Sequence, residues 1–155
     1  MSLRTKVAGF GALTRDERGI FFASLAFTPL VAVMLRCIGL RRVQALLERA
    51  ELPACEAGEV AHADAVHRMA RVFAAAARCA PGGARCLPKA LALQWLLRGR
   101  RIATQLRIGV RKEGDRLQAH AWLEHRGEPL LEDREVHERF AAFERTDPLS
   151  ERATK

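Results

Sequence analysis

The chain has 155 residues, 49% hydrophobic and 28% charged, which is enough for one folded domain and excludes disorder as the main state. Lys and Arg outnumber Asp and Glu by 26 to 18, and the formal charge of +8 favours an acidic partner: nucleic acid, an anionic membrane or an acidic peptide. The chain has no tyrosine, and its other aromatic residues do not alternate with basic ones, which argues against base stacking and a nucleic-acid partner. An acidic peptide fits best.

The first predicted helix begins at a capping box, in which Thr14 and Glu17 bond to free backbone amides. The uncharged, apolar residues 20–35 follow, and Pro29 should kink or split the helix before Gly39 ends it. A membrane span needs about 20 apolar residues, so this shorter run favours a core helix over a membrane contact. If the helix is exposed, it would be a docking surface for another protein.

Two more helices complete the helical half. One is expected over residues 40–50. The next carries Val66, Met69 and Phe73 on one face and ends at the Pro-Gly-Gly of residues 81–83.

A mixed half follows, which makes the expected fold class α+β. Residues 87–98 have the helical period, and the period changes to two from residue 104. Strands are expected from residue 104 to a turn at 113–115, over residues 117–124, and over residues 129–132. Hydrophobic residues between 136 and 143 recur at helical spacing and predict a final helix.

The four cysteines are Cys37, Cys55, Cys79 and Cys86. They form no C-x-x-C pair, and the five histidines do not complete a zinc pattern. They are also too sparse for a disulfide scaffold. Reduced thiols, a cytoplasmic location and no metal or organic cofactor are therefore expected.

Cys86 differs from the other three cysteines in its position. It follows the Gly-rich break and begins a helix, where unpaired amides and the helix dipole favour a thiolate. Lys89, one turn on, adds positive charge. Composition alone would make Cys86 a small buried hydrophobe. Its position makes it the candidate nucleophile.

His120, in the middle of the second strand, is the candidate base, because a catalytic thiol needs an imidazole within hydrogen-bond reach. A lone strand histidine is more often structural or exposed. The hairpin that follows offers a carboxylate to orient it. A three-residue turn at 125–127 places Glu132 opposite His120, and a two-residue turn places Asp133 there. Glu132 is the preferred acid.

Three motifs occur in order: CLPKALALQWLL from Cys86, LRIGVRK from Leu106 and AHAWLE from Ala119. Together, over roughly residues 85–143, they closely resemble the lasso-peptide leader peptidases, the transglutaminase-like B2 maturation proteins. The resemblance implies a papain-like or transglutaminase-like core, with the cysteine helix packed on a small antiparallel sheet, and a Cys-His-Asp triad. Cys86 and His120 match the family positions. Glu132, with Asp133 adjacent, stands where the family has Asp.

The resemblance also implies a function and partners. The chain would be a cysteine peptidase that removes the leader from a ribosomally made precursor peptide before macrocyclisation. A separate leader-binding protein of winged-helix type, a macrocyclase and an exporter would be its partners. A single peptidase domain is expected at residues 1–148, with a helical part at 1–80, a catalytic core at 81–145 and a disordered tail at 149–155. A transglutaminase-type acyl transferase and a non-catalytic module that binds acidic peptides remain alternatives.

Overall fold

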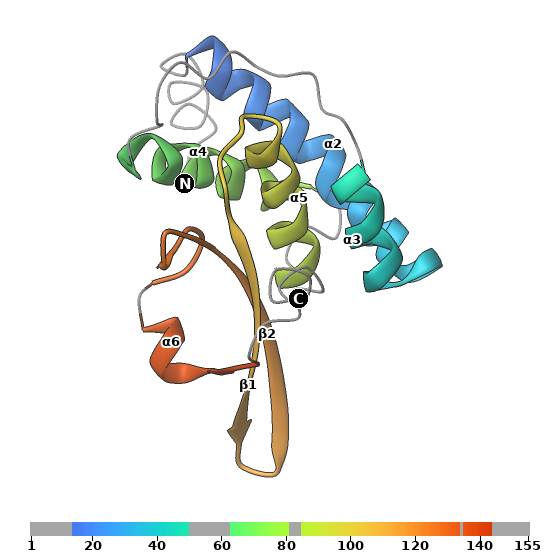
Figure 1. Cartoon of the computed structure of the whole chain (residues 1–155), viewed down its shortest axis with the longest axis vertical. Helices are drawn as coiled ribbons and strands as arrows, with labels where there is room; N and C mark the ends of the chain where they lie inside the picture. The colour runs from blue at the N-terminus through green and yellow to red at the C-terminus, as the bar shows by residue number, and fades with distance from the viewer. Residues whose placement is uncertain (1–13, 50–62, 81–84, 134, 144–155) are drawn as a thin grey trace, which may run out of the picture.

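The computed structural model describes residues 14–49, 63–80, 85–133 and 135–143. The elements in chain order are α2 (Arg15–Ile38), α3 (Leu40–Arg49), α4 (Ala63–Ala77), α5 (Cys86–Arg98), β1 (Gln105–Glu113), β2 (Arg116–His125), β3 (Glu128–Pro129), α6 (Val136–Arg139) and β4 (Ala141–Ala142). Helices α2 to α5 gather at one end of the molecule, and the β1–β2 hairpin extends away from them (Figure 1). The predicted α+β class is confirmed. The Pro-Gly-Gly break and the predicted tail lie outside the described residues.

Helix α2 begins at the predicted capping box. The Thr14 backbone amide donates to Glu17 Oε2 over 2.8 Å, and the Glu17 amide donates to Thr14 Oγ1 over 3.2 Å. Arg68 Nε of α4 also donates to Glu17 Oε1 over 2.6 Å. The Thr14 amide and the Arg68 guanidinium hold the pKa of the Glu17 carboxyl below its usual range, although burial opposes them. Pro29 lies inside a continuous helix rather than splitting it, and Gly39, with φ of 78°, ends it as predicted.

Helix α5 is the central element of the core. Its buried residues lie on all of its sides, and they are Pro88, Ala90, Leu91, Ala92, Leu93 and Leu97. A helix that is apolar all round must be covered all round, and α5 packs against α2, α4 and β2. Val31, Phe73 and Leu123, one from each of these elements, share its hydrophobic cluster. The start of α5 is therefore held in place from several directions.

The four strands form an antiparallel sheet in the order β3-β2-β1-β4. His125 pairs with Glu128, so the connecting turn is Arg126–Gly127 alone, and the preferred three-residue turn was wrong. Both turn residues have positive φ, 54° and 83°, as the type I′ hairpin turn requires.

The third and last predicted elements were also wrong in extent. Strand β3 covers two residues instead of 129–132, because the consecutive residues Leu130 and Leu131 both pack against the core. A strand would point them to opposite faces. Helix α6 is a single turn and not a helix to residue 143, since β4 follows it and the Phe143 amide donates to Ile108 O of β1 over 2.9 Å.

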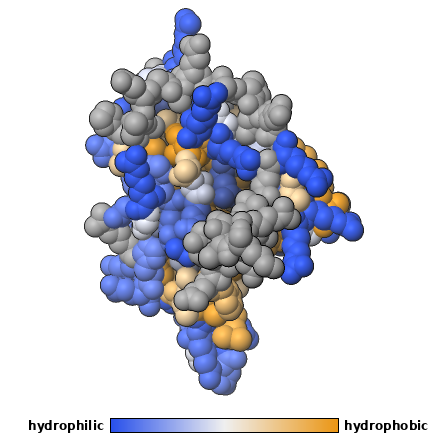
Figure 2. Space-filling view, in the orientation of Figure 1, coloured by the Kyte–Doolittle hydropathy of each residue, from blue (hydrophilic) through white to orange (hydrophobic). Residues whose placement is uncertain are grey.

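Only one side of α2 belongs to the core. Its buried residues include Ile20, Ser24 and Thr28, whereas Phe22, Leu30 and Val33 are more than half exposed. By length and composition alone α2 is the one described helix that passes a test for membrane spans, a test that core helices also pass. Where α2 ends beside α3, hydrophobic residues are exposed among hydrophilic ones (Figure 2).

Candidate active site

Cys86 is the first residue of α5 and is half-buried. The preceding residue, Arg85, has extended backbone angles and makes no side-chain cap, so the first-turn amides are not capped from there. Pro88, in the same turn, carries no N–H. Cys86 and Leu87 therefore supply the N–H groups of the first turn that have no acceptor within the helix. Such N–H dipoles at a helix start stabilise negative charge close to the first turn, where the Cys86 thiol lies.

The thiol opens onto a cavity of about 870 Å³. One wall is the second half of α2, another is the start of α5, and β2 contributes one side chain, His120. The lining residues are Pro29, Ala32, Val33, Leu35, Arg36, Arg85, Cys86, Leu87, Pro88, Lys89 and His120. The structure thus brings the predicted nucleophile and the predicted base to the same cavity. The two are not hydrogen-bonded to each other in this structure; such contacts commonly tighten when substrate binds.

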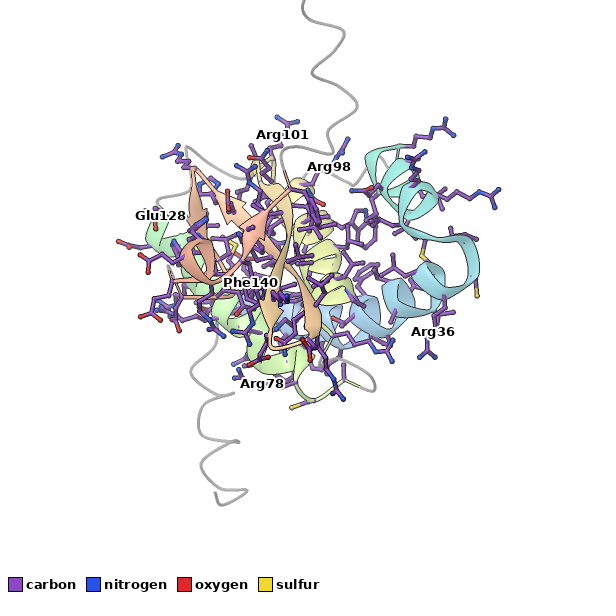
Figure 3. The ribbon with its side chains drawn as sticks, turned by 90° about the horizontal axis from the view of Figure 1, so that it is seen from below. Arg36, Arg78, Arg98, Arg101, Glu128 and Phe140 are labelled. Carbon is purple, nitrogen blue, oxygen red and sulfur yellow. The ribbon has the colours of Figure 1, made fainter. Side chains whose placement is uncertain are left out.

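The imidazole of His120 is held by a carboxylate and two aromatic rings. Its Nε2 lies 3.3 Å from Glu132 Oε1. The Phe140 ring stacks on it with centroids 5.0 Å apart, and the Trp122 ring does so at 6.2 Å. Phe140 lies beside the strands of the hairpin (Figure 3). Because Nε2 is the ring nitrogen that lies within ion-pair distance of Glu132, Nδ1 is the nitrogen left to exchange a proton with a thiol.

Glu132, and not Asp133, is the acid that reaches the imidazole. The observed hairpin register, extended along the strands, would put Asp133 opposite His120. The chain leaves the ladder before that point, and Glu132 bends back to the ring. Asp133 is exposed, and its backbone carbonyl accepts from the Val136 amide at the start of α6 over 3.0 Å.

A buried carboxylate behind His120 was missed in the sequence. Glu124 is only 4% exposed and accepts from Trp122 Nε1 over 2.8 Å and from Arg107 Nε over 3.1 Å. His137 Nδ1 lies 3.6 Å from the same carboxylate. Glu124 thereby holds the indole that stacks on His120. The sequence does carry a signal for this role: Glu124 is four residues after His120 on the same strand and therefore lies on the same face of the sheet.

Gly109 was missed as well. It lies opposite His120 in the β1–β2 register and beside Ala142 of β4. A Cβ at this position would lie 3.0 Å from the Trp122 ring and 3.0 Å from Ala141 O. Only glycine lets the indole and β4 approach this closely. An isolated glycine inside a strand is the sequence signal for such an approach.

A half-buried thiol at the start of a central helix, with a sheet histidine on the same cavity, belongs to folds that typically carry a cysteine peptidase or an acyltransferase. A family model described as the transglutaminase-like superfamily matches residues 30–145. The chain therefore belongs to the transglutaminase-like superfamily. The match begins within α2 and extends past β4, so it includes Cys86, His120, Glu132 and every other site residue discussed above except Pro29. Comparisons with curated proteins and with solved structures found no match.

Proposed function

We propose that the chain is a cysteine peptidase that removes the leader from a lasso precursor peptide before macrocyclisation. The observation that carries the proposal is that Cys86 and His120 line one cavity while Glu132 lies 3.3 Å from Nε2 of the imidazole. Membership in the superfamily supports a thiol-dependent reaction at a carbonyl. The motifs around Cys86 and His120, which resemble those of leader peptidases, support the choice of substrate.

The chemistry follows from this arrangement. The Cys86 thiol gives its proton to His120, and the resulting thiolate attacks the carbonyl carbon of the scissile bond, so that a C–S bond forms. The developing oxyanion lies near the first-turn amides of α5, which donate to it. His120 gives a proton to the departing amine as the C–N bond breaks. A water molecule, deprotonated by the same imidazole, then hydrolyses the thioester and restores the thiol. Glu132 holds His120 in the tautomer that both steps use.

The proposed partners follow from the proposed substrate. A separate leader-binding protein of winged-helix type would present the precursor, and the macrocyclase would take the released core before an exporter removes it. We therefore propose that the chain acts in the cytoplasm.

The decisive experiment is to incubate the chain with a lasso precursor peptide and its leader-binding partner, and to identify the products by mass spectrometry. A free leader fragment is expected with the natural chain and none with Cys86→Ala or His120→Ala. Cys79→Ala, which alters an exposed thiol two residues beyond the end of α4, is the matched control and should cleave normally. Cleavage that survives in Cys86→Ala would refute the peptidase.

Two alternatives give different products in the same experiment. An acyl transferase would pass the acyl group to an added amine such as putrescine, and the mass would report the amide. A non-catalytic module would bind the acidic peptide and leave it intact, and Cys86→Ala would not change that binding.

A further inference from the structure

The cavity beside Cys86 is strongly basic. Arg36 comes from α2, Arg85 precedes α5, and Lys89 lies one turn into α5. Among the residues that line it, no side chain is acidic, and the nearby Glu132 is paired with His120 Nε2. Like charges gathered in a cleft with low-dielectric walls reinforce one another and attract anions. An anionic group near the thiol would therefore be attracted to this cavity.

The other half of the lining is apolar and lies mainly on α2. Ala32, Val33 and Leu35 line the cavity, and Val33 is 58% exposed. Leu30 and Phe22, on the same side of α2 at helical spacing, are 51% and 59% exposed. The exposed face of α2 is unusually apolar. The buried face contains the polar residues Glu17, Ser24 and Thr28, so much of the helix's apolar surface points outward. An exposed apolar stripe that leads into a cavity is typical of a surface that binds another chain.

The two properties meet at a single place. Val33 and Arg36 lie one turn apart on α2, and both line the cavity that contains Cys86. Its volume, about 870 Å³, lies within the range of ligand-binding pockets, ~300–1,000 Å³. A peptide segment with a carboxylate beside an apolar side chain matches both walls at once.

We propose that this cavity selects peptide substrates that carry an Asp or Glu next to an apolar residue close to the reactive bond. Arg36, Lys89 and Arg85 attract the carboxylate, and the Val33 wall receives the apolar side chain. The inference rests on the proposed function only in taking the ligand to be a peptide substrate. The basic cavity itself can be tested without any cleavage.

The first experiment measures how fast Cys86 is alkylated by iodoacetate and by iodoacetamide. The two reagents differ in charge, and mass spectrometry of the full chain assigns the modified cysteine. The ratio of the two rates at Cys86 is expected to exceed that of N-acetylcysteine by about 10-fold, the low end of electrostatic steering. Added salt should reduce it. The double variant Arg36→Gln with Lys89→Gln should lose most of this excess.

Arg98→Gln is the matched control, because it removes one positive charge at the opposite end of α5. Arg98 is the twelfth residue after Cys86, a rise of about 18 Å at 1.5 Å per residue, which is beyond the Debye length of ~10 Å at 0.1 M salt. Arg36 and Arg98 also lie on different sides of the molecule (Figure 3). A ratio equal to that of N-acetylcysteine, or one that falls equally in Arg98→Gln, would overturn the proposal.

The second experiment uses internally quenched peptides that are identical except for Glu, Gln or Lys beside a leucine near the cleaved bond. Glu is expected to give about 10-fold higher kcat/KM than Gln, and the double variant should lose this preference. Cleavage without a preference for Glu would overturn the inference and leave the peptidase standing. Selective alkylation without cleavage of any peptide would refute the peptidase and support the basic cavity. If the α2 surface around Val33 bound phosphatidylglycerol vesicles and no peptide was preferred, the proposal that the ligand is a peptide would be overturned.

Discussion

Replacing Glu124 with alanine should both destabilise the fold and disturb the packing that positions the His120 imidazole. The change leaves Trp122 Nε1 without its acceptor, and the Trp122 side chain is fully buried. An unsatisfied buried donor costs about 1–3 kcal/mol. Arg107 also loses its partner, but its side chain is 28% exposed and can turn to water, so this loss adds about 0–1 kcal/mol. The free energy of unfolding should therefore fall by about 1–4 kcal/mol.

Urea denaturation monitored by tryptophan fluorescence measures this loss. In a thermal scan the same loss lowers Tm by about 2–4 °C for each kcal/mol in a domain of this size. Glu113→Ala is the matched control on the same hairpin. Its side chain is 58% exposed and pairs with Arg111 at 3.3 Å, so the cost should stay below about 1 kcal/mol. Glu124→Gln keeps one acceptor oxygen for the indole and should recover part of the loss.

The same variant should also lower the cleavage rate of the folded protein. The Trp122 ring stacks on His120, and a displacement of about 1 Å at a catalytic group costs up to about 100-fold. The loss is expected in kcat more than in KM, because the substrate cavity is lined by other residues. If Glu124→Ala and Glu113→Ala unfold at the same urea concentration and cleave equally fast, Glu124 does not hold the indole in place.

Three further predictions concern the site and the start of α2. Glu132→Gln should lower kcat by about 100-fold or more, whereas Asp133→Asn should change it by less than about 2-fold; equal losses in the cleavage assay would contradict the assignment of the acid. Gly109→Ala adds a Cβ 3.0 Å from its neighbours in the sheet and should lower the free energy of unfolding by about 1–3 kcal/mol in urea, whereas Gly19→Ala, with nothing within 4 Å, should not lower it. The depressed pKa of the Glu17 carboxyl stabilises the fold fully above about pH 4.5, and this stabilisation is lost as the pH falls through the lower pKa of the folded state. Glu17→Gln should therefore flatten this part of a plot of unfolding free energy in urea against pH. An unchanged slope would contradict the ion pair.

The local elements were predictable because their signals lie within a few residues. The capping box at Thr14 needs only the residues of one helical turn, and Gly39 ends α2 through its own backbone angles. Helix α5 and strands β1 and β2 lie within one or two residues of the predicted ranges, because their hydrophobic periods are uninterrupted. The helix is not split at Pro29, because packing of α2 against α4 and α5 holds it continuous across that residue.

The site was predictable only in part, because its members come from different elements. A cysteine at a helix start and a histidine in a strand can each be recognised in a sequence, but that they line one cavity depends on how α2, α5 and β2 pack. The His120 imidazole stacks on Phe140. The helix predicted from the sequence extends to residue 143 and includes Phe140, whereas α6 ends at Arg139. Pairing of β4 with β1 depends on Gly109, and that contact joins residues more than thirty positions apart.

The position of Glu132 shows how two deviations combined. The turn is one residue shorter than the preferred one, and this alone would have moved Asp133 opposite His120. The strand then ends early, because Leu130 and Leu131 both pack against the core and cannot alternate across a sheet. The chain bends at these leucines and brings the Glu132 carboxylate to 3.3 Å from His120 Nε2. Strand pairing extrapolated from the turn cannot predict this bend. The bend is set by the hydrophobic core against which β3 ends. The acid of this site is therefore chosen by hydrophobic burial at its neighbours as much as by strand pairing.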